Sequence, residues 1–516
     1  MGQKEFLLKA QNALESAPTE MMSAGRPLRV LLIQPPLTDR VQSFVPTQNE
    51  EEQGIGHKPP QGILWVASTI KYMSPHDVKV IDAQPANMSY DDIVAEAVAY
   101  NPDIVGVSAW TDLWYPAYIT GKRIKEALPD CHLSYGGPHL GIYPQETLDV
   151  PFIDSVIVGD GEVPFLNLCN LISNDVIDNS FPGLHFKDGG VKPYPNTLYV
   201  HGDLDGLPKP DRTMLPVKNY TSVMSRKTGY VTTMITSRGC PHQCTFCKLN
   251  FQKTLARSAE SVVEEFREIA ALGICEVEIY DDTFTWGRER LRKICEGLIE
   301  ADLGVEWAIR DRVNKPDPEL LALMYKAGCR RVNYGVESGA EHVLKRIKKR
   351  ITPDEARQAV KLAKEAGLTV VTYFMFGNMD ETMEDMQKTI DFALSINTDY
   401  AEFSVTIPYA GTEMYEEALR EGIVDHDYWR DFAREPSPRF TPPQVIENNV
   451  TLEQMMAMRN KAIRQFYFRP KYLAREAFRQ ASLGEFLRKA RMGARLLQYV
   501  LTKHAIPRAT QSVYRN

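Results

Sequence analysis

Two series of short apolar runs, separated by a stretch rich in proline, glycine and aspartate, constrain most strongly what this chain can fold into. The first series lies within residues 28–199 and the second within residues 225–450. In both, the runs alternate with longer segments that have apolar residues at helical spacing. Uninterrupted apolar runs are typical of parallel strands that are buried on both faces. The sequence therefore predicts two successive α/β units, joined by a linker over residues 200–224.

The first series predicts a doubly wound sheet. Its expected strands are Arg29–Gln34, Val78–Ile81, Ile104–Ser108, His132–Tyr135 and Ser155–Val158. Ligands of such sheets bind beyond the carboxyl ends of the strands, at the point where the strand order reverses. Several glycines stand at these ends, and a glycine lets the backbone approach a bulky ligand closely. No Gly-x-Gly-x-x-Gly follows the first run, which argues against a dinucleotide.

The second series predicts an open barrel. Its six expected strands are Tyr230–Thr236, Glu276–Tyr280, Glu306–Arg310, Arg331–Val336, Thr369–Met375 and Ala401–Thr406. Six strand–helix units are fewer than the eight of a closed barrel, so we expect a partial (β/α)6 barrel. Beyond this barrel, residues 451–516 have a helical pattern.

Charge is distributed unevenly along the 516 residues. The whole chain has a net charge of -7, yet residues 451–516 contain 14 Lys+Arg against 3 Asp+Glu. A basic segment on an acidic body indicates an anionic partner or surface for that segment, but not a nucleic-acid-binding protein. Residues 1–29 lack a signal-peptide pattern and no run of about 18 apolar residues is present, so we expect a cytoplasmic protein.

Three of the eight cysteines lie close together. Cys240, Cys244 and Cys247 occur in Ser-Arg-Gly-Cys-Pro-His-Gln-Cys-Thr-Phe-Cys, directly after the first strand of the second unit. Such crowding favours a metal site over a disulfide. Three thiolates on one loop can hold three irons of a 4Fe-4S cluster and leave the fourth iron open to a ligand. The alternative is a zinc site with His242 as fourth ligand, although zinc sites favour paired CxxC units.

The cysteine motif, with Phe246 just before its last cysteine, resembles the radical S-adenosylmethionine (SAM) superfamily. The resemblance implies that the open iron binds SAM, and that an electron from the cluster splits SAM into methionine and a 5′-deoxyadenosyl radical. It also implies SAM-binding residues at the ends of successive barrel strands: Asp281, Asp282, Arg310, Glu337, Ser338 and Gly377. Asp-Asp stands where the family's commonest pattern has Gly-Gly-Glu. The alternative role for such polar residues is helix capping.

The first unit resembles the cobalamin-binding domain of one large subfamily of these enzymes, and with the barrel the resemblance covers residues 28–420. It implies that cobalamin is lined by Pro35, Ser108, Trp110, Thr111, Gly136, Gly137, His139 and Gly161. Better-known cobalamin proteins carry Asp-x-His-x-x-Gly, whose histidine binds cobalt. Here the equivalent strand end reads Asp82-Ala-Gln-Pro-Ala-Asn, which implies cobalt without a histidine ligand from this loop. The alternatives are a nucleotide or no ligand, and for Trp110 and Trp114 a place in the core.

The subfamily's commonest reaction is methylation of an unactivated carbon. The resemblance implies that one SAM methylates cobalamin, and that a second SAM, split at the cluster, provides the radical that abstracts a hydrogen from the substrate. The substrate carbon then takes the methyl group from methylcobalamin. A minority of relatives instead cyclise or oxidise a tetrapyrrole or lipid with the same cofactors. The non-enzyme alternative is a cobalamin- or metal-binding sensor, although no output module is visible.

The expected partners follow from this chemistry. We expect a C-methyltransferase that acts on a medium-to-large small-molecule substrate, including apolar ones such as a lipid or tetrapyrrole. The resemblance also implies an electron donor such as flavodoxin or ferredoxin. Which side chain acts as a general acid or base is not indicated by the sequence.

The basic C-terminal region, residues 451–516, has two interpretations. Either it forms an amphipathic surface that contacts a membrane peripherally or binds an apolar anionic substrate, or its helices cap the open barrel and extend their basic ends into water. We favour capping. Large apolar side chains are interleaved with the basic ones: Phe466, Tyr467, Tyr472, Leu473, Phe478, Leu483, Phe486, Leu487, Leu496 and Leu497.

Overall fold

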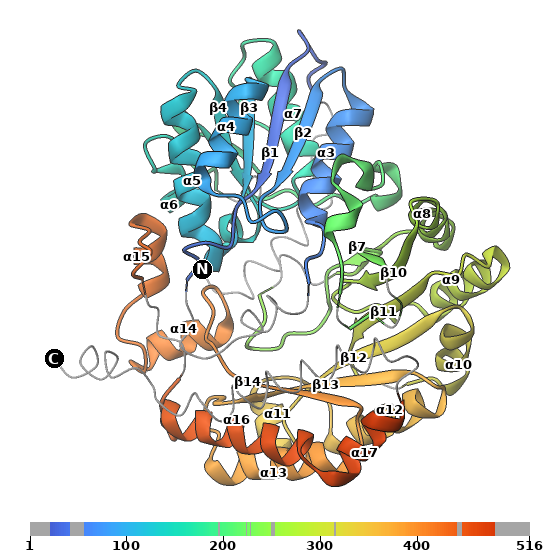
Figure 1. The fold of residues 1–516 in the computed structure, drawn as a ribbon. Coiled ribbons are helices and arrows are strands. Elements are labelled where there is room, and N and C mark those ends of the chain that lie inside the picture. Colours follow the sequence, from blue (N-terminus) through green and yellow to red (C-terminus); the bar gives the residue numbers. More distant parts are fainter. Residues whose placement is uncertain are drawn as a thin grey trace.

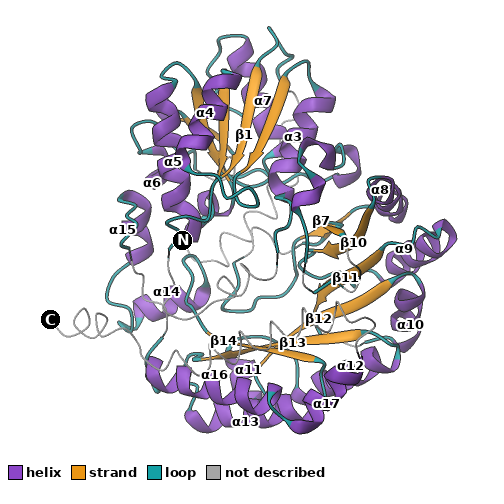
Figure 2. Ribbon diagram, in the orientation of Figure 1, coloured by secondary structure: helices purple, strands orange, loops and turns teal. Residues whose placement is uncertain are grey.

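Two α/β units whose sheets face each other make up the described part of the chain (Figure 1). The computed structural model describes residues 21–479, except 42–55, 194–196, 223, 226, 228, 249–252, 314–315 and 441–445. In both units helices lie on the outside of the strands, as Figure 2 shows. The two units that the apolar runs predict are thereby confirmed.

The sheet of the first unit has the strand order β2-β1-β3-β4-β5-β6. The strands are β1 (Arg29–Gln34), β2 (Asp77–Asp82), β3 (Ile104–Ser108), β4 (His132–Gly136), β5 (Ser155–Ile157) and β6 (Leu184–Phe186). β1 to β5 are parallel, whereas β6 is antiparallel to β5. The order reverses between β1 and β3, so the carboxyl ends of these two strands form the ligand-binding edge typical of a doubly wound sheet. The predicted doubly wound sheet is confirmed, and the short β6 is an addition to it.

Five helices cover the first sheet: α3 (Gln61–Met73), α4 (Tyr90–Tyr100), α5 (Trp114–Ala127), α6 (Pro144–Leu148) and α7 (Glu162–Ser173). Local sequence sets their ends. A capping box of Ser89 and Asp92 begins α4, and Asn101 ends it in the left-handed conformation. The apolar faces of these helices bury Trp65 on α3 and Trp114 on α5 against the sheet.

The second unit is an open barrel of six parallel strands in the order β14-β13-β12-β11-β10-β7. The strands are β7 (Tyr230–Met234), β10 (Ile274–Ile279), β11 (Glu306–Asp311), β12 (Cys329–Glu337), β13 (Thr369–Phe376) and β14 (Tyr400–Val405). A short antiparallel pair, β8 (Ser237–Arg238) and β9 (Leu255–Ala256), brackets the cysteine loop. The predicted partial (β/α)6 barrel is confirmed.

Six helices follow the barrel strands: α8 (Ala259–Ala271), α9 (Arg288–Ala301), α10 (Pro318–Lys326), α11 (Glu341–Arg346), α12 (Pro353–Glu365) and α13 (Met383–Ser395). Side-chain caps fix where several of them begin. Capping boxes at Thr352 and Thr382 begin α12 and α13, and Ser258 caps α8. These caps therefore fix where α8, α12 and α13 begin at the mouth of the barrel.

The segment that we predict to be a linker, residues 200–224, consists of short 3-10 turns packed against both units. Arg212 Nη2 donates to Glu265 Oε1 at 2.6 Å, and Tyr220 Oη donates to Asp82 Oδ2 at 2.9 Å. Because Glu265 belongs to the barrel and Asp82 to the first sheet, these bonds attach the segment at both ends. It therefore fixes the two units relative to each other.

Two helices of the C-terminal region cover the open edge of the barrel: α16 (Leu452–Tyr467) and α17 (Pro470–Arg479). The two helices before them lie elsewhere. α14 (Glu413–Arg420) bonds to the cysteine loop through Met414 N and Thr245 O, and α15 (Tyr428–Arg434) packs on α6 of the first unit. α16 lies against β14 and α13. Arg459 Nε donates to Phe403 O at 2.8 Å, and Tyr467 Oη donates to Ala401 O at 2.7 Å. The described part of the region thus fits the capping interpretation, whereas residues 480–516, including Leu483, Phe486, Leu487, Leu496 and Leu497, lie outside the described residues.

Within the described ranges, no helix is both long enough and apolar enough to span a bilayer.

Candidate active site

The carboxyl ends of the strands of the two units face each other (Figure 1). Side chains from these ends meet directly. Arg238, after β7, donates from Nη2 to Glu162 Oε1, after β5, at 2.5 Å. Lys58, which precedes α3, donates to Glu278 Oε2 of β10 at 2.5 Å and to Tyr280 Oη at 2.8 Å. The two edges that the sequence predicts to bind ligands therefore lie opposite each other.

The cysteine loop is anchored at its base by Asp281. Its carboxylate accepts hydrogen bonds from Thr236 N at 2.6 Å, from Thr236 Oγ1 at 2.5 Å and from Ser237 Oγ at 2.7 Å. The neighbouring Asp282 accepts from Gly239 N at 2.8 Å and stays exposed. Asp281 is therefore bonded to the loop. Of the two carboxylates predicted to bind SAM, Asp282 is the accessible one.

Polar groups surround the three sulfur atoms. Arg312 Nη1 lies 3.3 Å from Cys244 Sγ, and Thr283 Oγ1 lies 3.5 Å from Cys240 Sγ. Burial, together with the neighbouring Cys244, Asp282 and Cys240, raises the pKa of Cys247 to about 12. A thiolate in this position therefore needs a bound cation to be stable. The donor set fits an iron–sulfur cluster, with Arg312 stabilising the charge on sulfur.

The alternative of a single zinc ion has no support in the geometry. Among residues that the structure describes, no group of three or more His, Cys, Asp and Glu side chains is placed to hold one metal ion. Zinc–sulfur bonds of about 2.3 Å draw all ligands close around one centre. A cluster instead binds each thiolate to a different iron, so its three sulfur atoms stand farther apart.

The residues predicted to bind SAM lie on neighbouring strand ends, and two of them are committed elsewhere. Arg310, at the end of β11, is exposed and stacks on Tyr280, with its guanidinium 4.1 Å from the ring centre. Among the described residues its guanidinium makes no ion pair, so it is available to a carboxylate. Ser338, in contrast, is fully buried; its Oγ is bonded to Thr389 Oγ1 and accepts from Ala340 N. Like Asp281, it is therefore bonded within the protein, but neither residue caps a helix, because α9 begins after Gly287 and α11 after Ala340.

Glu337 and Gly377 complete the predicted set. Glu337 has a φ of 71° and accepts from Lys349 Nζ at 2.6 Å. Gly377 has a φ of +82°, and its N donates to Glu381 Oε2 at 2.7 Å. Each of these two positions is therefore fixed by a partner that the sequence reasoning missed.

Lys58 is a third missed residue, and it belongs to a charged group inside the barrel. Glu278 accepts from Lys58 and, at 2.7 Å, from Arg331 Nη2. Lys58 lies 220 residues from Glu278 along the chain, so local sequence carries no signal of the contact. The pairing brings a cation of the first unit to the mouth of the barrel.

The opposite edge, on the first unit, is built largely from backbone and small side chains. A Cβ added at Gly136 would meet no atom within 4 Å, whereas one at Gly137 would lie 2.7 Å from Ala109 O. Trp110 is 49% exposed, and Ser108 and Thr111 are half-buried. This edge offers open space and exposed aromatic surface at the switch in strand order, which fits a large flat ligand such as cobalamin.

The remaining predicted residues of this edge lie less openly. Pro35 is buried and its carbonyl accepts from Gln84 Nε2 at 3.2 Å, while Gly161 lies beside Val66. The loop after β2, residues 82–87, has no histidine, and Asp82 is bonded to Tyr220. The described loop therefore fits a cobalt ion that lacks a histidine ligand from this position.

His139 is a correction to our expectation. Its ring is fully buried and stacks on Trp114 at a centroid distance of 4.5 Å, with Nδ1 3.3 Å from Thr111 Oγ1. Burial lowers the pKa of His139 to about 3, so the ring is neutral. The 3-10 turn Pro138–Gly141 directs this side chain into the core, away from the surface. Trp114 is likewise a core residue.

The comparisons with known proteins agree with this arrangement. The model of the radical SAM superfamily matches residues 234–393, and that of the B12 binding domain matches residues 56–169. The chain is 32% identical over 457 residues to the uncharacterized methyltransferase PH0819 of Pyrococcus horikoshii, a match that covers 87% of this chain and 95% of the relative. It is 29% identical over 439 residues to the anaerobic magnesium-protoporphyrin IX monomethyl ester cyclase of Rubrivivax gelatinosus, covering 81% of this chain and 78% of that one.

Among solved structures, the fold is similar to OxsB, described as a cobalamin-dependent S-adenosylmethionine radical enzyme. The TM-score is 0.67 at 16% sequence identity, and the match covers 95% of this chain and 74% of that chain. At this identity the likeness concerns the fold, and it extends over both α/β units.

Proposed function

The chain belongs to the family of radical SAM enzymes that carry a B12-binding domain, and we propose that it methylates an unactivated carbon of a medium-to-large substrate. Its cofactors are a 4Fe-4S cluster, SAM and cobalamin. The relative PH0819 is named a methyltransferase, and the match covers 95% of its length. The proposal extends that activity to this chain.

One observation carries the proposal: the cysteine loop and the open edge of the first sheet face each other. Arg238 and Lys58 tie the two edges together at 2.5 Å contacts. A substrate between them would be in reach of a radical source on one side and a methyl donor on the other. Holding reactants in such a geometry replaces encounters in solution by a reaction within one site.

When bound, the cluster supplies the electron that cleaves SAM and cobalamin supplies the methyl group. The protein residues hold and orient these groups. Cys240, Cys244 and Cys247 hold the cluster, and Arg312 donates to one of its sulfur ligands. Asp282 and Arg310, both exposed at strand ends, are proposed to bind the ammonium and the carboxylate of SAM. Gly136, Gly137 and Trp110 are proposed to contact cobalamin.

The enzyme acts on a small molecule and takes electrons from an external donor. We propose flavodoxin or ferredoxin as this donor, because a low-potential one-electron carrier suits a cluster that must reduce SAM. A tetrapyrrole or another apolar substrate such as a lipid is supported by the similarity to the magnesium-protoporphyrin IX monomethyl ester cyclase. A peripheral membrane contact is a separate proposal that concerns residues 480–516, and liposome co-sedimentation of the full chain and of a truncation after Arg479 tests it.

Anaerobic reconstitution tests the function. The protein is loaded with iron, sulfide and cobalamin, reduced, and given SAM; 5′-deoxyadenosine and S-adenosylhomocysteine are then quantified. Formation of both products supports methyl transfer. A strain that lacks the protein should accumulate a metabolite lighter than the normal product by one methylene. Absence of both nucleoside products would leave the sensor alternative.

Oxidative cyclisation is the second candidate. The observation in its favour is the 29% identity to the Rubrivivax gelatinosus cyclase over 81% of this chain. This reaction needs SAM cleavage but no methyl donation, so 5′-deoxyadenosine without S-adenosylhomocysteine would favour it.

A further inference from the structure

A buried ion-pair group joins the cysteine loop to the open edge of the first sheet. Arg238 Nη2 donates to Glu162 Oε1 at 2.5 Å, and Arg238 Nη1 lies 3.2 Å from Asp160 Oδ1. The three side chains are only 14%, 4% and 11% exposed. A guanidinium stays protonated in proteins, so Arg238 is a cation held between two carboxylates of the other unit.

On the barrel side, Arg238 is held close to the cluster ligands. It lies two residues before Cys240, and β8, which contains it, pairs with β9. Asp281 fixes the preceding residue, Ser237, and Asp282 fixes the following one, Gly239. Because its neighbours are held on both sides, Arg238 has little freedom to shift without moving the cysteine loop.

On the side of the first unit, Asp160 lies in the turn between β5 and α7, and Glu162 is the first residue of α7. Asp160 Oδ2 also accepts from His201 N at 2.9 Å. Gly159 has a φ of +97°, and a Cβ there would lie 2.0 Å from Tyr199 O, so the turn is packed tightly. Gly161, which we propose to lie against cobalamin, stands between the two acids. The ion pairs therefore connect Arg238 to the part of the first unit that we propose to contact cobalamin.

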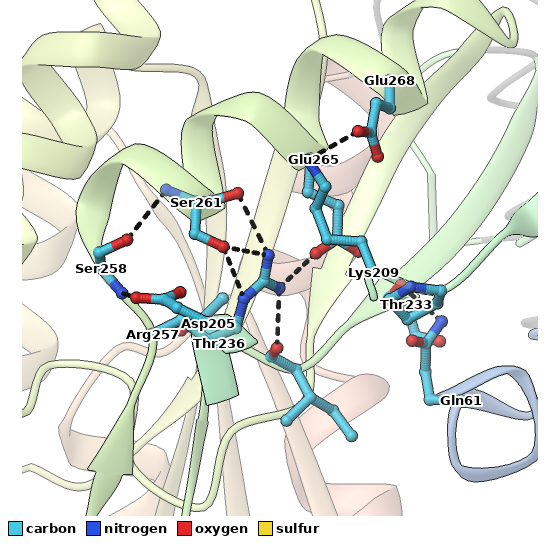
Figure 3. Close-up of polar contacts among 12 residues, drawn as sticks. Gln61, Asp205, Lys209, Thr233, Thr236, Arg257, Ser258, Ser261, Glu265 and Glu268 are labelled. Carbon is cyan, nitrogen blue, oxygen red and sulfur yellow. Dashed lines mark hydrogen bonds and ion pairs between the residues drawn. The ribbon is translucent and has the colours of Figure 1, made fainter. Parts of the chain in front are cut away.

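A second contact braces the guanidinium. Trp65 of α3 lies between two arginines, with its ring centre 5.3 Å from Arg238 and 5.6 Å from Arg257. Figure 3 shows how Arg257 is itself held by Ser261 and Glu265. Glu265 also accepts from Arg212 of the segment between the units. The group is thus tied into the barrel wall.

From this geometry we infer that Arg238 is a positioning residue that sets the distance between the cluster and cobalamin. The inference rests on the proposed function. A buried, two-sided ion pair stabilises one arrangement of its partners more than others, which suits a device for spacing. Reductive cleavage of SAM needs only the cluster, whereas transfer of its methyl group to cobalamin needs both edges in register. A displacement of about 1 Å can cost two orders of magnitude in rate.

The test measures spacing directly. When the cluster is reduced and the cobalamin is held as cob(II)alamin, each carries an unpaired electron, so pulsed electron paramagnetic resonance reports the distance between them. The test variant is Arg238→Met combined with Asp160→Asn and Glu162→Gln, which removes the three charges together and leaves none unpaired. We expect a broadened or displaced distance distribution. Without substrate, the ratio of S-adenosylhomocysteine to 5′-deoxyadenosine should fall about tenfold or more.

Two further variants separate positioning from general damage. Arg238→Lys keeps the charge but lacks the planar fork whose separate nitrogens bond the two acids, and should give an intermediate distance width and ratio. Lys364→Met removes the 3.1 Å ion pair with Asp399 on the far side of the barrel and should match the unaltered protein. An unchanged distance distribution and product ratio in the triple variant would overturn the inference. An unaltered protein that binds no cluster or no cobalamin would overturn the proposed function and this inference with it.

Discussion

The two edges that face each other differ in how many charged side chains they present. At the barrel edge, carboxylates and cations are present and mostly paired: Glu337 with Lys349, and Glu278 with Lys58 and Arg331. At the edge of the first unit, Asp160 and Glu162 are bonded to Arg238, and the open part around Gly136 and the exposed Trp110 presents backbone and apolar surface. The difference matches the ligands. A small zwitterion and an anionic cluster need compensating charges, whereas a large macrocycle needs space and surface.

The comparison also explains why the chain needs contacts between the edges. Neither edge alone contains both chemistries, so the reaction depends on their spacing. The contacts that fix this spacing, Arg238 with Glu162 and Lys58 with Glu278, are charged and nearly buried. Four experiments test this difference between the two edges.

The largest effect is expected from the cysteines. Changing Cys240, Cys244 and Cys247 together to alanine should reduce iron content and 5′-deoxyadenosine formation to background, because no other ligands replace three thiolates. Cobalamin binding at the other edge should persist, as measured by the visible spectrum after gel filtration. Cys295→Ala, a buried cysteine of α9, serves as control and should retain iron. Retention of iron by the triple variant would contradict the cluster site.

The second effect concerns the open edge. Gly136→Phe would place a ring in the space above Gly136, where an added Cβ meets nothing within 4 Å. We expect the Kd for cobalamin to rise about tenfold or more, a loss of about 1.4 kcal/mol, with iron content unchanged. Gly202→Phe is the matched control, because a Cβ at Gly202 also meets nothing within 4 Å. Equal cobalamin affinity in both variants would show that the ligand lies elsewhere.

A third, moderate effect is expected at the sulfur atoms. Arg312→Met removes the donor 3.3 Å from Cys244 Sγ, which stabilises the more negative, reduced cluster. The midpoint potential should fall by roughly 60 mV, a tenfold shift for a one-electron couple. Lys345→Met, which removes an exposed charge on α11, should leave the potential within error because solvent screens it. A rise in potential for Arg312→Met would refute this role.

The smallest effect is a pH dependence at Glu381. Burial raises the pKa of Glu381 from 4.5 to about 7, against the hydrogen bonds from Asn378 and Gly377. The folded state therefore binds this proton more tightly than the unfolded state. Its contribution to stability is present below about pH 4.5 and is lost as pH rises through 7, by at most about 3 kcal/mol.

Glu381→Gln should remove this loss. The melting temperature of the variant should fall less than that of the unaltered protein between pH 5 and 8. Glu300→Gln, at an exposed position of α9, is the control and should follow the unaltered profile. Parallel profiles for the Glu381 variant and the unaltered protein would contradict the assignment.

The strands of both sheets could be predicted because parallel strands are buried on both faces and so read as apolar runs. β1, for example, keeps the consecutive residues Val30, Leu31, Leu32 and Ile33 buried. The cysteine loop could also be predicted, because its ligands lie within eight positions of the sequence. Local chemistry was sufficient in these cases.

Contacts between distant segments could not be predicted. Arg238 and Glu162 are 76 residues apart, and only the docking of two sheets brings them together. Lys349 lies in a basic run that resembles a solvated surface. Positive φ values at Lys348 and Arg350 turn the chain, so that Lys349 points inward to Glu337. Local sequence also did not indicate that His139 is buried. The 3-10 turn Pro138–Gly141 directs its side chain into the core.

The packing of α16 on β14 has a consequence for how the chain is handled. β14 is the last strand of an open sheet, and such a strand offers unpaired carbonyl groups to any other strand that approaches it. Arg459 and Tyr467 occupy two of these groups, at Phe403 and Ala401. A protein shortened at Thr451 would therefore expose the unpaired carbonyl groups of β14 and should self-associate. One shortened after Arg479 keeps them covered. α16 thus protects the sheet edge from aggregation, independently of what the basic residues of the C-terminal region bind.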